Sequence, residues 1–327
     1  MTDDDTTAGR APDDAALRAA MHRVRTEIGK AVIGQEGAIT GLLIALLARG
    51  HVLLEGVPGV AKTLLVRSFS RALGLDTRRI QFTPDLMPGD VTGSLVYDAR
   101  SGGFEFREGP VFTHVLLADE INRTPPKTQS ALLEAMEERQ VSADGVSRIL
   151  PDPFLVAATQ NPVEHEGTYT LPEAQLDRFL LKLTVEVPSR DAEVAVLRRH
   201  ADGFSPRDLG AIEPAASPDE IREAQRAAAS VAVTDEVLAY VVDLARATRE
   251  APSVQLGASP RASTALLAAA KAWAWLGGSP AITPDHVQTM LSATWRHRIR
   301  LSADAELEGV TVDAILASVL RQTRVPI

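Results

Sequence analysis

The sequence predicts an α/β protein with two domains, in which a parallel sheet lies between helices and a small helical domain follows. Short apolar runs alternate with helical patterns over residues 51–187, which is typical of a parallel sheet covered on both faces. Two hairpin signals interrupt this alternation, and after Pro188 the composition changes to Ala-rich helices. The length of 327 residues also favours more than one core.

The expected elements can be read in chain order. Helical spacing covers residues 15–48 and is interrupted by a turn at Val32-Ile33-Gly34-Gln35. We expect strands at 51–54, 80–82, 115–118, 154–158 and 180–187, and helices at 62–73 and 126–138. Hairpins should pair 94–97 with 104–107 and, around Asp144-Gly145, 140–142 with 147–149. In the second half, helix N-caps are expected at Ser217, Thr234, Ser259 and Thr283.

The domain boundaries and the composition narrow the class of protein. We expect a disordered acidic tail at 1–14, an α/β domain at 15–187 and a helical domain at 188–327. A net charge of -9 has the wrong sign for a protein that mainly grips nucleic-acid phosphates. The absence of any apolar run of about 18 residues, together with an acidic N-terminus, predicts a cytoplasmic protein without membrane insertion. Having no cysteine, the chain has no disulfide or thiolate site, and its seven histidines show no metal-ligand spacing.

A glycine-containing loop stands between a predicted strand and a predicted helix. It reads Gly56-Val57-Pro58-Gly59-Val60-Ala61-Lys62-Thr63, and Leu64 follows. In that context backbone N–H groups cradle phosphates, the lysine reaches the β- and γ-phosphates of ATP, and the Thr63 hydroxyl binds Mg²⁺. Ala61 replaces the usual last glycine, and we expect it to adopt the negative φ of a loop-to-helix junction. The alternative is a Gly-Pro turn before a helix with an exposed lysine.

Polar residues also follow two other predicted strands. Asp119 and Glu120 end the strand at 115–118, at the edge where parallel sheets bind ligands. We expect Asp119 to hold Mg²⁺ through its water shell and Glu120 to polarise the attacking water. Asn161 follows the strand at 154–158 and would orient that water from between Glu120 and the γ-phosphate. The alternatives are a helix cap for the acids and an Asx turn before proline for Asn161.

The ordered set of motifs resembles the AAA+ ATPases, and specifically their MoxR branch. The resemblance covers residues 15 to the C-terminus and rests on five segments: 32–35, 56–63, Asp119-Glu120-Ile121-Asn122-Arg123, 158–162 and Leu171-Pro172-Glu173-Ala174-Gln175-Leu176-Asp177-Arg178-Phe179. It implies that the turn formed by Val32, Ile33, Gly34 and Gln35 packs on the adenine. It also implies that Arg178 is an arginine finger that reaches the ATP of a neighbouring subunit.

The same resemblance implies a second sensor at Ser259-Pro260-Arg261. A cation in the first turn of a helix is unfavourable to the helix dipole, so a phosphate that compensates Arg261 would explain its place. The alternatives are ion pairs of Arg178 with Asp177 or Glu173 on its own surface, and a solvated Arg261. We expect Trp273, Trp275 and Leu276 to pack in the core of the helical domain. The run Arg296-His297-Arg298-Ile299-Arg300 is expected on a solvated helix face or in a subunit contact.

Together these features predict a motor that hydrolyses Mg²⁺-ATP in a homo-oligomeric, hexameric ring and remodels client proteins. The resemblance implies a partner with a von Willebrand factor A domain and a role in maturation, including metal or cofactor insertion. A nucleotide-dependent scaffold with little turnover is one alternative. A nucleic-acid motor is another, although the two hairpin tips, at 98–103 and 143–146, offer only Arg100 as a cation.

Overall fold

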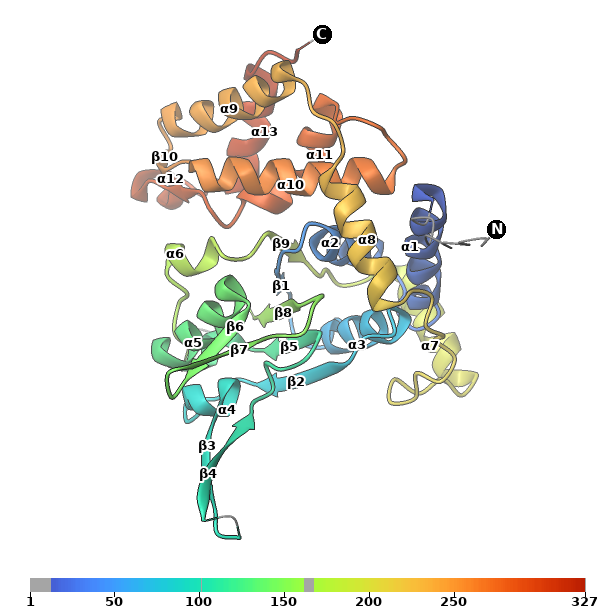
Figure 1. Ribbon diagram of the computed structural model, residues 1–327. Coiled ribbons are helices and arrows are strands. Elements are labelled where there is room, and N and C mark those ends of the chain that lie inside the picture. Colours follow the sequence, from blue (N-terminus) through green and yellow to red (C-terminus); the bar gives the residue numbers. More distant parts are fainter. Residues whose placement is uncertain (1–12, 101, 162–167, 327) are drawn as a thin grey trace, which may run out of the picture.

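The computed structural model describes residues 13–100, 102–161 and 168–326, and its centre is a five-stranded parallel sheet (Figure 1). The strand order is β2-β5-β8-β1-β9. The strands are β1 Val52–Glu55, β2 Thr77–Gln81, β5 Val115–Asp119, β8 Leu155–Gln160 and β9 Leu181–Thr184. All of the predicted strands are present. β2 begins earlier than expected, at Thr77, and β9 ends earlier, at Thr184.

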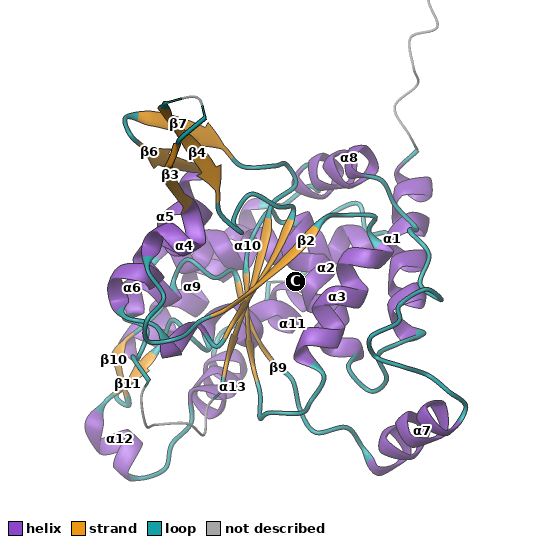
Figure 2. Ribbon diagram, turned by 90° about the horizontal axis from the view of Figure 1, so that it is seen from below, coloured by secondary structure: helices purple, strands orange, loops and turns teal. Residues whose placement is uncertain are grey.

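Helices cover both faces of this sheet (Figure 2). One layer contains α1 Asp14–Gly29, α2 Glu36–Leu47 and α3 Lys62–Ala72, and the other contains α4 Pro88–Thr92, α5 Pro126–Glu138 and α6 Glu173–Leu176. Because side chains alternate along a strand, Leu54 and Leu117 pack with the first layer, whereas Leu53 and Leu116 pack with the second. Burial on both faces explains why β1, β5 and β8, in the interior of the sheet, are apolar over most of their length.

The N-terminal boundary differs from the expectation by two residues. Helix α1 begins at Asp14, and the Asp13 side chain caps it by accepting a hydrogen bond from the backbone N–H of Ala15. Asp14 is therefore the first residue of the helix and Asp13 is its N-cap, so neither belongs to the tail. The rest of the expected tail lies outside the described residues.

Both predicted hairpins are confirmed. β3 Gly93–Asp98 pairs with β4 Gly103–Glu108, and β6 Gln140–Ala143 pairs with β7 Val146–Ile149. The registers are as expected: Tyr97 lies opposite Phe104, and Gln140 lies opposite Ile149. The β3–β4 hairpin projects from the body of the molecule (Figure 1).

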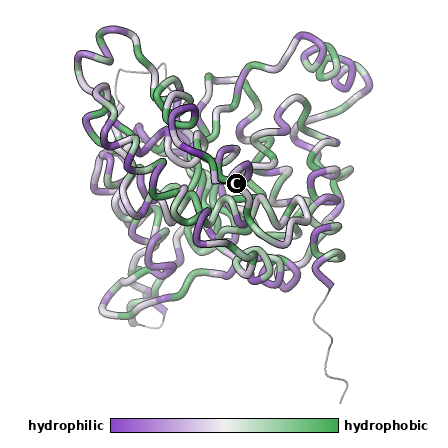
Figure 3. Tube along the Cα trace, turned by 90° about the horizontal axis from the view of Figure 1, so that it is seen from above, coloured by the Kyte–Doolittle hydropathy of each residue, from purple (hydrophilic) through white to green (hydrophobic). Residues whose placement is uncertain are grey.

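The C-terminal part is helical. It contains α8 Pro218–Ala229, α9 Asp235–Glu250, α10 Pro260–Leu276, α11 Pro284–Trp295, α12 Ala303–Leu307 and α13 Val312–Gln322, with short strands β10 Val254–Leu256 and β11 Arg300–Leu301. All four expected N-cap residues directly precede helices. Trp275 and Leu276 are buried and Trp273 packs against the same core, as predicted. Seen from above the view of Figure 1, apolar stretches of chain gather toward the middle of the molecule (Figure 3).

Two further elements complete the described chain: η1 Ile121–Arg123 and α7 Arg190–Ala201. Helix α7 lies against the turn between α1 and α2, where Arg199 donates hydrogen bonds to the carbonyls of Gly29 and Lys30. Within the described ranges, no helix is long and apolar enough to cross a membrane.

The expectation of a solvated helix face at residues 296–300 is wrong for the centre of the run. His297 and Ile299 are buried, and the Arg298 side chain is only 4% exposed. The run follows α11 and turns inward onto the segment before β9, where Arg298 bonds to Asp177. A basic run can therefore be interior when acidic and carbonyl partners meet it.

Candidate active site

Three neighbouring strands end at one cavity. The loop after β1, the acids at the end of β5 and the residues at the end of β8 meet there, because β5, β8 and β1 are adjacent and parallel. The cavity has a volume of about 440 Å³. The residues that line it are Pro58, Gly59, Val60, Ala61, Lys62, Thr63, Leu64, Arg67, Asp119, Glu120, Thr159, Asn161, Pro206 and Arg207. The structure thus brings together the predicted phosphate loop, both acids and Asn161.

Two glycines give the loop its close turn. A Cβ added at Gly56 would lie 2.4 Å from the carbonyl oxygen of Val185, so no side chain fits at this position. Gly59 has a φ of +88°, a conformation that L-residues rarely adopt. The Lys62 ammonium donates hydrogen bonds to the carbonyls of Gly56 and Val57. A positive charge and the N-terminus of α3 therefore lie together at this end of the cavity.

Ala61 does not have the expected negative φ. It adopts the left-handed conformation, with φ +64° and ψ +24°, immediately before α3. The substitution for glycine is therefore not conformationally neutral, since the left-handed region costs an L-residue roughly 1–2 kcal/mol. The Ala61 carbonyl accepts the first hydrogen bond of the helix, from the N–H of Leu65, so the helix and the loop together hold this conformation.

The buried hydroxyl of Thr159 links the two acids. It donates to Asp119 Oδ1 at 2.6 Å and accepts from the backbone N–H of Glu120 at 2.9 Å. The other oxygen of Asp119 receives Arg79 from β2, at 2.8 Å. These contacts fix the direction of the Asp119 carboxylate at the end of β5.

Glu120 is held by residues that the sequence did not single out. Gln81 Nε2 donates to Glu120 Oε2 at 2.6 Å, and Arg123 Nε lies 3.2 Å from the same oxygen. Glu120 also has a φ of +58°, so this acid stands in a strained turn directly after β5. Only the register of β2 against β5, which pairs Gln81 with Asp119, could have indicated Gln81.

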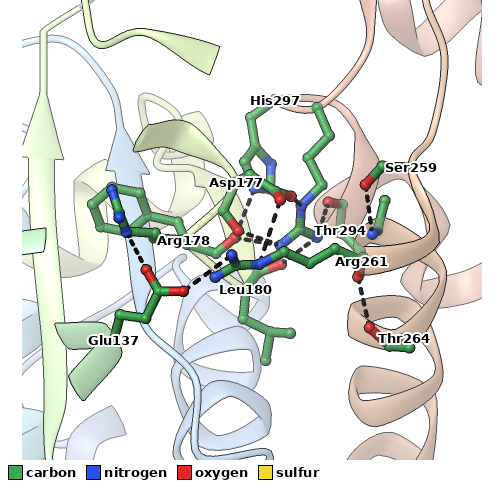
Figure 4. Close-up of polar contacts among 12 residues, drawn as sticks. Glu137, Asp177, Arg178, Leu180, Ser259, Arg261, Thr264, Thr294 and His297 are labelled. Carbon is green, nitrogen blue, oxygen red and sulfur yellow. Dashed lines mark hydrogen bonds and ion pairs between the residues drawn. The ribbon is translucent and has the colours of Figure 1, made fainter. Parts of the chain in front are cut away.

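Arg178 and Arg261 do not line this cavity; they meet elsewhere, at Glu137 on α5 (Figure 4). Arg178 Nε lies 2.7 Å from Glu137 Oε2, and Arg261 Nη1 lies 3.2 Å from Oε1. Arg261 also lies 3.4 Å from Asp177. The hydrogen bond from Arg178 is the main cause that lowers the pKa of Glu137.

The cluster differs from the alternatives considered for Arg178 and Arg261. Arg178 pairs with Glu137, whereas the alternative to an arginine finger was an ion pair with Asp177 or Glu173. Arg261 does stand in the first turn of α10 after the Ser259 cap, as predicted, but the charges beside it are the carboxylates of Glu137 and Asp177.

The turn at residues 32–35 lies beside the end of β9. Gly34 has a φ of +75°, and Gln35 Nε2 donates to the carbonyl of Glu186 at 2.8 Å. Gly34 and Gln35 line a separate cavity of about 410 Å³ together with Thr184. Among the described residues, none of the turn lines the cavity at the phosphate loop.

Known proteins share both halves of this architecture. Residues 51–181 match the ATPase family associated with various cellular activities (AAA), and residues 246–319 match the AAA lid domain. The chain is 47% identical to the uncharacterized protein YeaC of Bacillus subtilis, over 92% of this chain and 93% of YeaC. It is 42% identical to the chaperone MoxR1 of Mycobacterium tuberculosis, over 94% of this chain and 82% of MoxR1.

The chain belongs to the MoxR family of AAA+ ATPases. A crystal structure from Cytophaga hutchinsonii superimposes with a TM-score of 0.89 at 39% identity and covers 96% of this chain and 97% of that one. The protein is accordingly an ATPase, and its match to the AAA lid domain covers residues 246–319, from the end of α9 to α13.

Proposed function

We propose that this MoxR-family ATPase hydrolyses Mg²⁺-ATP at the interfaces of a homo-oligomeric, hexameric ring and uses the energy to remodel client proteins in the cytoplasm. The observation that carries the proposal is the separation of two sets of residues. The phosphate loop, Asp119, Glu120 and Asn161 share one cavity, whereas Arg178 and Arg261 meet outside it. Such a division suits a site completed by a second subunit.

The residues at the cavity fit a nucleotide and its metal ion. Loop N–H groups and the Lys62 ammonium would bind the phosphates. The oxygens of Thr63 and Asp119 are hard ligands of the kind that Mg²⁺ prefers. When bound, the ion would neutralise charge on the phosphate oxygens. Glu120 would hold and polarise water, and Asn161 would orient it.

The position of Arg178 supports action on a neighbouring subunit. It follows α6, which lies on the opposite face of the sheet from α3 and its Lys62 (Figure 2). Arg261 of the lid lies at the same carboxylate as Arg178, so both cations would be presented together. We propose that a ring places this pair at the ATP of the next subunit, where an arginine finger typically contributes on the order of 10³ to 10⁵ in rate.

The β3–β4 hairpin supports an action on proteins. Tyr97 and Phe104 are 58% and 70% exposed, and their rings contact each other edge to face. A projecting hairpin with an exposed apolar pair beside its tip suits exposed apolar segments of a client polypeptide. The relative MoxR1 is named a chaperone. The MoxR resemblance adds a partner with a von Willebrand factor A domain and a role in maturation, including metal or cofactor insertion.

Steady-state phosphate release tests the motor against a binding scaffold. Glu120→Gln and Arg178→Ala should each lose turnover, and Glu120→Gln should still bind ATP and form rings, as measured by size-exclusion chromatography with light scattering. Unchanged turnover in both variants would overturn the proposed motor. A strong stimulation by DNA or RNA at low salt would instead favour a nucleic-acid motor. Affinity capture with Glu120→Gln then identifies the client.

A further inference from the structure

A buried arginine of the lid grips the backbone of the finger segment, which we define as residues 177–180. Arg298 follows α11, and its Nε donates to Asp177 Oδ1 at 2.7 Å. Its Nη2 donates to the carbonyls of Phe179 and Asp177, at 2.8 and 3.2 Å. Its Nη1 donates to the carbonyls of Thr294 and Leu180, at 2.8 and 3.4 Å. All five N–H groups of the guanidinium are thus satisfied, four of them by the finger segment.

The preceding residue makes a parallel contact. His297 Nε2 lies 2.9 Å from the carbonyl oxygen of Phe179, and the ring is buried. A carbonyl only accepts, so Nε2 must carry the proton in this contact. Two adjacent residues of the lid, His297 and Arg298, therefore bind the carbonyl of Phe179, which directly follows Arg178.

Stability alone does not explain a buried guanidinium here. A well-packed apolar residue usually stabilises a protein interior at least as well as a buried ion pair does. The guanidinium instead fixes the orientation of the finger segment relative to the lid, because its planar group binds several acceptors of that segment at once. The chain of contacts also continues: Asp177 binds Arg298 and Arg261, and Arg261 and Arg178 share Glu137.

We propose that Arg298 and His297 are positioning residues that fix the finger segment to the lid, so that a movement of the lid in one subunit changes the ATP site of its neighbour. This inference rests on the proposed role of Arg178 as an arginine finger. It assigns to the lid of each subunit a function at the site of the next one. A displacement of Arg178 by about 1 Å would suffice to lower turnover on the order of a hundredfold.

Mixed rings separate this role from a structural one. Arg298→Gln should lower kcat at least tenfold, while the KM for ATP changes less than about threefold because the phosphate loop of the same chain is intact. Mixing Arg298→Gln with Glu120→Gln chains should restore phosphate release. The Glu120→Gln chain has a correctly positioned Arg178, which it presents to the intact phosphate loop and Glu120 of a neighbouring Arg298→Gln chain. Mixing Arg298→Gln with Arg178→Ala should restore nothing, because both lack a working finger.

The mixed-ring experiment needs a control variant and a second variant of the proposed positioning residues. Arg296→Gln is the matched control and should retain kcat. Arg296 binds Thr184, Ser292 and Asp313, and within the described ranges it makes no hydrogen bond to the finger segment. If Arg298→Gln does not form rings, His297→Gln provides the same test, with a smaller loss that Glu120→Gln again restores.

The proposed finger role and the inference fail in different ways. If Arg178→Ala mixed with Glu120→Gln recovers turnover but the lid variants do not, the positioning role is overturned while the finger remains. Wild-type kcat in Arg298→Gln and His297→Gln overturns it as well. If Arg178→Ala itself is not complemented, the finger falls, and the lid inference falls with it.

Discussion

The Arg178 guanidinium lies 2.7 Å from the Glu137 carboxylate, which also receives Arg261 of the lid. One carboxylate thus holds two cations side by side. Without it the two guanidiniums repel each other and lose their shared anchor. Glu137→Ala should therefore lower ATPase turnover about tenfold or more. The Glu137 side chain is 36% exposed, so the loss of unfolding free energy should stay below about 1 kcal/mol. Glu138→Ala, one residue further along α5, is the control, and equal rates in the two variants would contradict this account.

The Thr159 hydroxyl should matter for both stability and turnover. It is completely buried and bonds to the Asp119 carboxylate and the Glu120 N–H. Thr159→Val keeps the shape but leaves these groups without their partner, which should cost about 1–3 kcal/mol. Urea unfolding and phosphate release measure the two effects. Thr159→Ser keeps the hydroxyl and should retain most of both; a Val variant as stable as the Ser variant would show that the network contributes little.

The left-handed conformation of Ala61 predicts a stabilising substitution. Ala61→Gly removes strain at φ +64° and should raise the free energy of unfolding by roughly 0.5–1 kcal/mol, after the greater flexibility of glycine in the unfolded chain is subtracted. Gly59→Ala is the opposite change, at φ +88° with no atom near the added Cβ. It should destabilise by a similar amount and weaken ATP binding. Thermal unfolding and nucleotide titration test the pair, and a destabilised Ala61→Gly protein would be inconsistent with strain at this position.

Buried His51 should make the protein acid-sensitive. Its Nδ1 accepts from the N–H of Val156, and its Nε2 donates to the carbonyl of Met136. Burial is the main cause that lowers the pKa of His51 from 6.5 to about 4. The unfolded chain therefore binds a proton before the folded one does, so this contribution to stability is complete above pH 6.5 and is lost as the pH falls toward 4.

At pH 5 this loss amounts to roughly 2 kcal/mol. Unfolding by urea at pH 7.5 and at pH 5 measures it, and His51→Gln should show a smaller difference between the two pH values than the wild type. His22→Gln, at an exposed position of α1, is the control and should show the same pH dependence of stability as the wild type. An unchanged pH dependence in His51→Gln would refute this assignment.

Local sequence patterns predicted most of the fold, because hairpin turns, helix caps and strand ends depend on residues that are close together in the sequence. The Asp144-Gly145 turn specified its hairpin and register, and Ser259 specified the start of α10. The strand ends predicted which residues meet at the cavity, since adjacent parallel strands end at one edge. Lys62, Asp119 and Asn161 were found in this way.

Features that depend on distant partners could not be predicted. The φ of Ala61 is set by how the loop meets the sheet and α3, and its residue type indicates the opposite sign. The burial of Arg298 depends on the carbonyls of the finger segment, which no local pattern connects to α11. The contact of Gln81 with Glu120 depends on the pairing of β2 with β5, which the sequence did not specify.

The most direct test of a shared ATP site is phosphate release by an equimolar mixture of Glu120→Gln and Arg178→Ala chains, measured beside each variant alone. Each variant should be nearly inactive by itself. Random mixing pairs a competent phosphate loop with an intact finger in about one interface out of four, so the mixture should recover up to about a quarter of the wild-type rate. No recovery in mixed rings of confirmed assembly, or an Arg178→Ala protein with wild-type turnover, would contradict a site completed by the neighbouring subunit.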